Sequence, residues 1–289
     1  MQALIDGDIL VYRCGFAAEK QRVKITFKDG TKDDLLASEY RKSNQEYRDK
    51  IESTERYTAP EPIENALFTT KRVIQKILNT VGTDSYQVYL TSDDKSNFRF
   101  KLATIKEYKG NRKNSKKPIH YQAIRDYLIQ YHDAEVVSGM EADDAMGIAM
   151  CNGCGHKICC TIDKDLRMIP GLHHHLDWDK QGLPKIEKIE DPGFVRLETT
   201  RTGRHKLWGG GMLWFYAQML LGDSADNIPK IPKMGPVSVH AILKDKTADE
   251  AKQEVVGVYN EHFLKKGHTL PEICAILKEV GSLLWIRRK

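Results

Sequence analysis

The segment Gln2-Ala3-Leu4-Ile5-Asp6-Gly7-Asp8 (residues 2–8) runs from a short apolar stretch directly into acidic residues. The same arrangement recurs at three later points in the chain. The four apolar runs, each a candidate strand, are Ala3–Ile5, Gln87–Thr91, Ala134–Val137 and Lys157–Ile162. The acids that follow them are Asp6, then Asp93 and Asp94, then Glu141, Asp143 and Asp144, and finally Asp163 and Asp165.

Helical patterns separate these runs, over Ile63–Val81, Tyr121–Gln130 and Ala142–Cys151. Strands that alternate with helices predict an α/β fold, with a parallel-rich central sheet flanked by helices. The carboxyl ends of parallel strands meet at one edge of the sheet, where such folds bind ligands. We therefore expect the four acidic segments to converge.

Converging carboxylates repel one another. Two charges ~4 Å apart cost about 4 kcal/mol at a surface-like dielectric, so we expect cations to bind there and no protein cation to enter the pocket. Carboxylate oxygens suit Mg²⁺ or Mn²⁺. Two such ions about 4 Å apart stabilise both the attacking and the leaving oxygen of a phosphoryl displacement. A single aspartate after a strand is more often a turn or helix cap; four such acidic edges in one chain favour a site.

Composition sets the broad class. The chain has 289 residues, a formal charge of +5, 40% hydrophobic and 29% charged residues, and six cysteines. These values predict a globular protein, and the charge is compatible with a polyanionic partner. No apolar stretch approaches the ~20 residues of a membrane span. The first residues resemble a strand rather than a leader peptide, so we expect a cytoplasmic protein with reduced thiols.

The order of segments predicts two domains. A core would span 1–206 and a helical, DNA-binding region 207–289. The core carries an insertion at 19–62, in which Val23–Phe27 and Asp29-Gly30 predict a hairpin, followed by a charged helical stretch. In the last third of the chain, helical patterns cover Met212–Leu221, Val237–Leu243, Ala248–Phe263 and Pro271–Leu284.

Five motifs in a fixed order carry a resemblance. They are Leu4-Ile5-Asp6-Gly7, Asn97-Phe98-Arg99 with Tyr108-Lys109-Gly110-Asn111-Arg112, Glu141-Ala142-Asp143-Asp144, Asp163-Lys164-Asp165-Leu166, and Gly222-Asp223-Ser224-Ala225-Asp226-Asn227-Ile228-Pro229. This order, from residue 4 to about residue 243, resembles the 5′-nuclease superfamily. That family includes flap endonucleases, the 5′-nuclease domain of bacterial DNA polymerase I and stand-alone bacteriophage 5′–3′ exonucleases. The compact chain looks most like the last of these.

The resemblance implies roles for the acids. The ligands of the more tightly held metal would be Asp6, Glu141, Asp143 and Asp163. The second metal would be held by Asp165, Asp223 and Asp226. Asp144 matches a family acid beside the metals and is expected to assist catalysis. Asp93 matches the site acid after the second strand, although Asp94 fits the same register.

The segment 95–117 is basic and contains interleaved aromatic residues, a composition typical of contacts with single-stranded nucleic acid. The alternative is a solvated charged helix and loop. In the family this segment forms an arch or gateway over the metals. There Lys109 and Arg112 match residues that steer the scissile phosphate, and Tyr108 is expected to stack on an unpaired base. The further DNA contacts expected in the arch are Arg99, Lys113, Lys116 and Lys117.

A second DNA contact is expected at Ile231-Pro232-Lys233-Met234-Gly235-Pro236-Val237-Ser238, which resembles the helix–hairpin–helix turn of the superfamily. Backbone N–H groups at such a turn face a phosphate, and the family adds a bound K⁺. Lys230 and Lys233 stand where the family has glycines. The residues expected to contact DNA are Lys230, Lys233, Gly235 and Ser238. A plain helical hairpin is the alternative.

Three functions compete. The resemblance implies a structure-specific 5′ nuclease that uses two Mg²⁺ or Mn²⁺ ions on DNA with a 5′ end or 5′ flap, RNA-primed DNA included, in replication, primer removal or recombination. The alternatives are a PIN-like RNA-directed nuclease and a non-catalytic DNA-binding module. Two further metal sites receive little weight. Cys151, Cys154, Cys159 and Cys160 include a zinc-like spacing, and His173-His174-His175 is expected in a loop.

Overall fold

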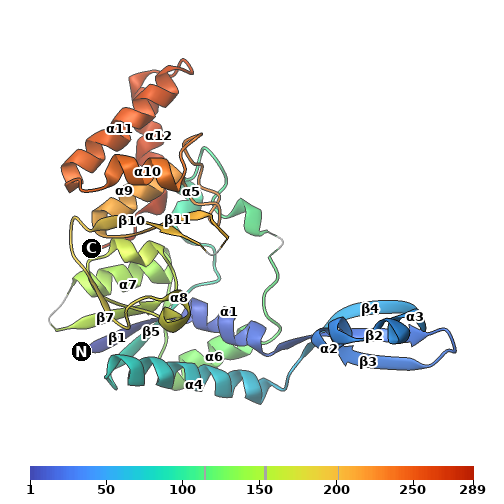
Figure 1. Cartoon of the computed structure of the whole chain (residues 1–289). Coiled ribbons are helices and arrows are strands. Elements are labelled where there is room, and N and C mark those ends of the chain that lie inside the picture. Colours follow the sequence, from blue (N-terminus) through green and yellow to red (C-terminus); the bar gives the residue numbers. More distant parts are fainter. Residues whose placement is uncertain (114, 153–154, 201) are drawn as a thin grey trace. The chain divides into compact units, whose positions relative to one another are not determined.

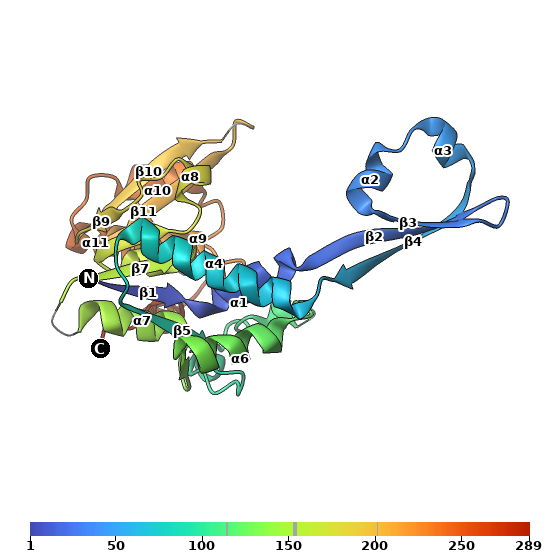
Figure 2. The same cartoon turned by 90° about the horizontal axis from the view of Figure 1, so that it is seen from below.

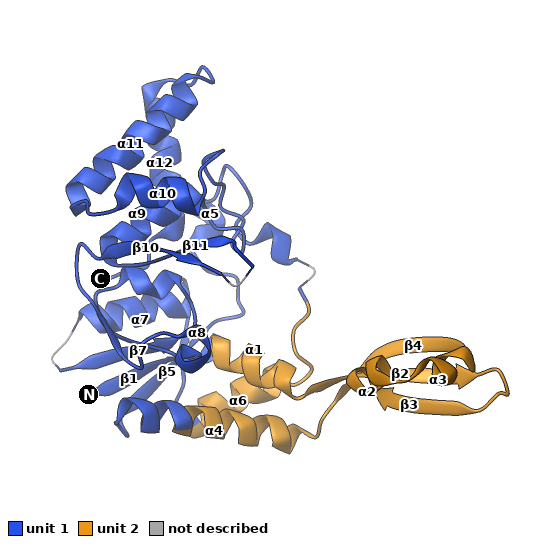
Figure 3. Cartoon of the chain, in the orientation of Figure 1, with its two compact units in different colours: residues 1–8, 76–115, 132–289 blue, residues 9–75, 116–131 orange. Residues whose placement is uncertain are grey.

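The structure, a computed structural model, describes residues 1–113, 115–152, 155–200 and 202–289. The chain divides into two compact units, shown in Figure 3. Unit 1 comprises Met1–Asp8, Lys76–Ser115 and His132–Lys289, and unit 2 comprises Ile9–Gln75 and Lys116–Tyr131. Within the described residues, no helix combines the length and the apolar character that crossing a bilayer requires.

A six-stranded sheet forms the centre of unit 1, with the strand order β6-β5-β1-β7-β8-β9. The first five strands in this order are parallel and the last is antiparallel. Their bounds are β1 (Gln2–Asp6), β5 (Tyr86–Thr91), β6 (Glu135–Val137), β7 (Lys157–Thr161), β8 (Gly171–His175) and β9 (Glu187–Ile189). Figure 1 shows β1, β5 and β7 side by side. The predicted parallel-rich α/β fold is therefore confirmed.

Strand β1 is central because it is apolar on both faces. Ala3, Leu4 and Ile5 are at most 1% exposed, as expected for a strand covered on both sides. Its register places Leu4 opposite Gln87 of β5 and Cys159 of β7. The three strands therefore end together, and the acids that follow them lie at one edge of the sheet.

Helices complete unit 1. Helix α7 (Ala142–Cys151) packs against β1, β5 and β7. Helix α9 (Gly211–Leu221) is buried almost throughout, because its sequence is apolar on every side. Around it pack η2 (Asp165–Met168), the hairpin β10 (Phe194–Thr199)–β11 (His205–Gly210), α10 (Pro236–Leu243), α11 (Ala248–Leu264) and α12 (Leu270–Leu284). The short helices α5 (Arg99–Leu102), η1 (Gly110–Arg112) and α8 (Trp178–Gln181) lie in connections.

Unit 2 contains the predicted insertion. Helix α1 (Gly7–Ala17) and helix α4 (Ile63–Val81) each belong partly to this unit, which also holds α6 (Tyr121–His132) up to residue 131. Figure 2 shows β2 (Glu19–Phe27), β3 (Lys32–Leu36) and β4 (Ile51–Pro60) side by side. The expected hairpin is β2–β3, and the expected helical stretch is α2 (Ala37–Lys42) and α3 (Gln45–Asp49). Strand β4, the other neighbour of β2, was not predicted.

One prediction about the fold is wrong. His173-His174-His175 was expected in a loop, yet these residues form the end of β8, paired in parallel with β7. Two of the imidazoles are satisfied by backbone carbonyls, His173 by Ile169 and His174 by Lys185, each at 2.7 Å. The division at residue 206 stays a prediction, since the sheet and the C-terminal helices share unit 1.

A close approach in unit 1 requires a glycine. A Cβ added to Gly147 of α7 would lie 2.4 Å from the backbone oxygen of Arg287 and 2.7 Å from the side chain of Ile286. The C-terminal segment that follows α12 therefore lies directly on α7, the helix that begins at the acidic motif Glu141–Asp144.

We expect Gly147→Ala to lower the free energy of unfolding by about 1–3 kcal/mol, because overpacking forces the backbone of the C-terminal segment away from α7. Gly257→Ala is the matched control. Gly257 lies in α11 with nothing within 4 Å of an added Cβ, so the alanine should stabilise the helix by roughly 0.5–1 kcal/mol. Urea unfolding of both variants measures the difference, and equal effects would contradict the close approach.

Candidate active site

The acidic segments meet in a pocket of about 130 Å³ in unit 1. Its carboxylates come from the start of α7, the residues after β7 and the loop after α9. They are Glu141, Asp143, Asp163, Asp165, Asp223 and Asp226. The predicted convergence is therefore observed for six of the proposed site acids.

Asp6, Asp143 and Asp163 form one group of acids whose charges interact. Asp6 is 3% exposed and accepts a 2.7 Å hydrogen bond from the Thr161 hydroxyl. Burial, followed by the charges of Asp163 and Asp6, raises the pKa of Asp143 well above its ordinary value. Burial also raises the pKa of Asp163. These carboxylates are therefore close enough to oppose one another's ionisation, as expected of acids that need a cation.

Asp165 follows on the same turn. Burial and the neighbouring Asp163 raise its pKa to about 7. Its Oδ1 accepts hydrogen bonds from the Gln218 amide and, at 2.8 Å, from the Lys164 ammonium. Helix α9 also fixes this turn, because the Trp214 indole N–H donates to the Lys164 carbonyl at 2.8 Å.

The loop after α9 supplies Asp223 and Asp226. Asp223 Oδ1 accepts hydrogen bonds from the backbone N–H groups of Ala225 at 2.6 Å and Asp226 at 3.3 Å. Its Oδ2 lies 2.5 Å from the Lys164 ammonium. Burial alone would raise the pKa of Asp223, but the charge of Lys164 and these hydrogen bonds hold it below its ordinary value. Asp223 is thus one of the acids that a protein cation already neutralises.

Three cations of the basic segment line the pocket, namely Arg99, Lys109 and Arg112. Lys109 pairs with Glu141. Arg112 lies 2.7 Å from Asp226. Burial lowers the pKa of Lys109, but the charges of Glu141 and Asp226 together raise it by more than burial lowers it. The net shift of the pKa is therefore upward. Lys109 and Arg112 both line the pocket and pair with its carboxylates, and a contact with a phosphate stays a prediction.

The expectation that no protein cation enters the pocket is therefore wrong. Lys109, Arg112 and Lys164 each pair with at least one of its carboxylates. The physical reason is the repulsion itself, because a buried acid without a cation must bind a proton. Lys164 was missed in the sequence, although its position between Asp163 and Asp165 was the available signal.

Asp144 is not among the residues that line the pocket, and Arg99, which does line it, is buried in an ion pair with Asp144. Asp144 is 0% and Arg99 1% exposed. The guanidinium donates to both carboxylate oxygens of Asp144, at 2.5 and 2.9 Å, and to the carbonyls of Leu283 and Trp285. The pair joins α7 to the end of α12. A catalytic role for Asp144 and a DNA contact by Arg99 stay predictions, and in this structure the two side chains are buried against each other.

Tyr108 does not offer a free ring to a base. It is 3% exposed, and its hydroxyl donates to Asp226 at 2.8 Å and lies 3.1 Å from Glu141. Asp93 and Asp94 are exposed and outside the residues that line the pocket. Asp94 instead accepts hydrogen bonds from Ser96 and Ser138, which lower its pKa.

The remaining proposed DNA contacts lie at the surface. Lys113 pairs with Glu107 at 2.7 Å. Lys116 and Lys117 belong to unit 2 and stay predictions. Between α9 and α10, Lys233 has a positive φ of 65°, whereas Gly235 does not. A positive φ favours glycine, so the backbone at Lys233 fits a position where the family has a glycine. Pro236 begins α10 as expected, and Lys230, Lys233 and Ser238 are exposed. Binding of DNA and of K⁺ at this turn stays a prediction.

No alternative metal site is supported. Cys159 and Cys160 are buried in β7, Cys151 is exposed on α7, and Cys154 lies outside the described residues. Across the described residues, no three or more histidine, cysteine, aspartate or glutamate side chains form a ready metal site. In the acidic pocket the ammonium groups of Lys109 and Lys164 pair with carboxylates, which agrees with the absence of a ready metal site there among the described residues.

An acidic pocket at the carboxyl edge of a parallel-rich sheet, lined also by basic loop residues, agrees with the resemblance to 5′ nucleases. Two curated relatives match part of the chain. One is DNA polymerase I of Bacillus caldotenax, 26% identical over 189 residues. The other is a 5′-3′ exonuclease of Buchnera aphidicola subsp. Schizaphis graminum, 26% identical over 187 residues. Together they confirm the resemblance to the 5′-nuclease superfamily.

The extent of these matches is limited. Each covers 62% of this chain, but only 20% of the polymerase and 59% of the exonuclease. No family model matches. Among solved structures, a T5 5′-exonuclease mutant gives a TM-score of 0.47 at 12% identity, over 98% of this chain and 84% of that one. A T5 protein co-crystallised with metal ions gives 0.46 at 14%, over 98% and 97%.

Removing Lys164 should strengthen metal binding, because its ammonium lies between Asp165 and Asp223. We expect Lys164→Ala to bind Mn²⁺ in the absence of DNA about tenfold more tightly, which corresponds to about 1.4 kcal/mol. Titration calorimetry or Mn²⁺ spin resonance measures this. Lys188→Ala, which removes an exposed lysine paired with Glu190, should leave the affinity unchanged. Unchanged or weaker binding by Lys164→Ala would contradict the argument.

The raised pKa of Asp165 predicts a pH-dependent stability of the metal-free protein. An acid whose pKa is higher in the folded than in the unfolded state stabilises the fold below its unfolded pKa. That stability is lost as the pH rises through the folded value, about 7. In EDTA the free energy of unfolding should therefore fall by about 1 kcal/mol between about pH 6 and 8. Asp165→Asn should weaken this dependence, and identical slopes in the two proteins would refute it.

Proposed function

We propose that this protein is a metal-dependent nuclease that hydrolyses DNA phosphodiesters at a 5′ end or at the base of a 5′ flap. The observation that supports it most directly is the buried group Asp6, Asp143 and Asp163, whose charges oppose one another. A purely structural cluster gains nothing from such repulsion, whereas a site that binds divalent cations needs it. The similarity to a 5′-3′ exonuclease and to DNA polymerase I supports the reaction class.

The donor chemistry fits Mg²⁺ or Mn²⁺. All candidate ligands are carboxylate oxygens, the hard donors that these ions prefer. The proposal assigns Asp6, Glu141, Asp143 and Asp163 to one ion and Asp165, Asp223 and Asp226 to the other, as the family resemblance implies. Two bound ions would lower the pKa of an attacking water and neutralise charge on both oxygens of the displacement. Ion binding requires the Lys164 ammonium to leave the oxygens of Asp165 and Asp223.

Lys109 and Arg112 are proposed to hold the scissile phosphate. Both lie over the acids, and their present partners, Glu141 and Asp226, are proposed metal ligands. When those carboxylates hold metal, the two side chains are released towards a phosphate at the mouth of the pocket. Arginine offers paired donors that match phosphate oxygens, and lysine a mobile point charge. Loss of Lys109 should therefore lower turnover more than affinity for duplex.

The turn between α9 and α10 is proposed to bind the duplex backbone without regard to sequence. Lys230 and Lys233 are exposed there, and α10 begins at Pro236 with its first N–H groups available. Phosphate binding at a helix N-terminus follows from these orphan donors. K⁺ at this turn, RNA-primed substrates, and a place in replication, primer removal or recombination belong to the same proposal and rest on the family resemblance.

A labelled 5′-flap substrate, a blunt duplex and a single-stranded RNA, each assayed with Mg²⁺ and with EDTA, test the function. We expect Mg²⁺-dependent release of 5′ products from the DNA substrates and none in EDTA. Asp163→Asn should reduce the rate of cleavage by more than about a hundredfold, because losing a direct metal ligand costs more than losing a residue that only orients one. Asp84→Asn, an exposed loop acid, is the control and should retain full activity.

Two results would overturn the proposal. Cleavage of RNA alone would favour the RNA-directed nuclease. DNA binding without cleavage in any divalent metal would favour the non-catalytic module.

A further inference from the structure

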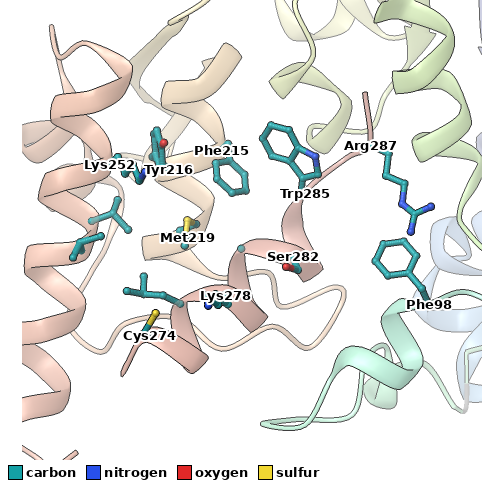
Figure 4. A pocket seen from close by; sticks show the side chains of 14 residues that line it. Phe98, Phe215, Tyr216, Met219, Lys252, Cys274, Lys278, Ser282, Trp285 and Arg287 are labelled. Atoms are coloured by element: carbon teal, nitrogen blue, oxygen red, sulfur yellow. The ribbon is translucent and has the colours of Figure 1, made fainter. Parts of the chain in front are cut away.

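A second, apolar groove lies in unit 1 between α9, α11 and α12, away from the carboxylates. Its volume is about 560 Å³, within the range of roughly 300–1,000 Å³ typical of ligand pockets. Figure 4 shows Phe215 and Met219 of α9 and Trp285 of the C-terminal segment pointing into it. Val255 and Leu277 complete the apolar lining. The active site described above uses none of these side chains.

Cations, but no acids, surround this groove. Lys252, Lys278 and Arg287 are the charged residues that line it. All three are exposed, and none of them forms an ion pair within the described part of the chain. They come from α11, α12 and the C-terminal segment, and Figure 4 shows them well separated along the groove. Separated cations suit an extended polyanion better than a small anion.

The aromatic rings of the groove favour a peptide over a nucleic acid. Stacking of bases needs open ring faces. The Arg287 and Arg99 guanidinium groups lie 4.2 and 4.7 Å from the centroid of Phe98. Trp285 has the Arg288 guanidinium at 4.8 Å and Phe215 in an edge contact at 5.1 Å. The groove therefore accepts apolar side chains against ring edges and aliphatic groups, while its rim attracts carboxylates.

We propose that this groove is a docking site for an acidic peptide segment of a partner protein, anchored by one or two bulky apolar side chains. The apolar floor supplies affinity through burial, as in helix-in-groove and pocket recognition. The three cations supply orientation and rate of association. This inference is independent of the nuclease function, because the residues that line the groove include none of the pocket carboxylates and neither Lys109 nor Arg112. Arg287 approaches Asp144 through its backbone, whose N–H donates to that carboxylate at 3.1 Å.

A fluorescein-labelled ten-residue peptide of Asp and Glu with Leu and Phe at two positions is the probe. Two matched peptides replace either the Leu and Phe by Ser or the acids by Lys. We expect micromolar binding of the first peptide alone in fluorescence anisotropy. Lys252→Glu with Lys278→Glu should weaken it more than tenfold, while Lys265→Glu with Lys266→Glu, just beyond α11, should not. Nuclease activity should be the same in all these variants.

Cys274 gives an independent readout, because it is exposed and lines the groove, whereas Cys151 is exposed elsewhere. The acidic apolar peptide should slow alkylation of Cys274 and leave Cys151 unaffected, as measured by mass spectrometry. Absence of binding, binding that ignores the charge reversals, or binding without protection of Cys274 would each overturn the proposal. Protection of Cys274 by oligothymidylate instead of the peptide would reassign the groove to nucleic acid.

Discussion

Repulsion among buried carboxylates is the constraint on which this structure depends. Parallel strands end at one edge, so the chain cannot separate Asp6, Asp143 and Asp163 without abandoning the sheet. Two effects reduce this repulsion in the protein alone. The raised pKa of Asp143 favours its protonated, neutral form, and ammonium and guanidinium groups pair with other carboxylates of the pocket.

The C-terminal helices hold residues of the acidic pocket in position. Gln218 of α9 donates to Asp165, and the buried Arg99–Asp144 pair joins α7 to the carbonyls at the end of α12. A buried ion pair of this kind is not evidence of net stability, since its desolvation is expensive. Its value here is positional: it fixes the start of α7, where Glu141 and Asp143 lie. Gly147 allows the same segment to approach α7 closely.

Much of this architecture follows from the sequence, and what does not has physical reasons. Helices α4 and α7 match their predicted bounds because long amphipathic or capped segments carry strong periodicity. Strands β8 to β11 were missed because a segment such as Gly171–His175 has no continuous apolar run; its pairing with β7 makes it a strand. Arg99 could not be placed from the sequence, because a lone arginine in a basic segment gives no sign that its carboxylate partner lies 45 residues away.

The protein cations in the pocket also suggest how the same side chains could act both with and without metal at the carboxylates. Lys109 and Arg112 pair with Glu141 and Asp226 in this structure, and under the proposed function both side chains would exchange these carboxylates for a phosphate if the carboxylates held metal. If ammonium and metal were alternative partners of the same oxygens, the net charge of the pocket would change little while the protein cations became free to bind a phosphate. Metal binding and phosphate capture would then be coupled through electroneutrality alone, without any change in the sheet that carries the acids.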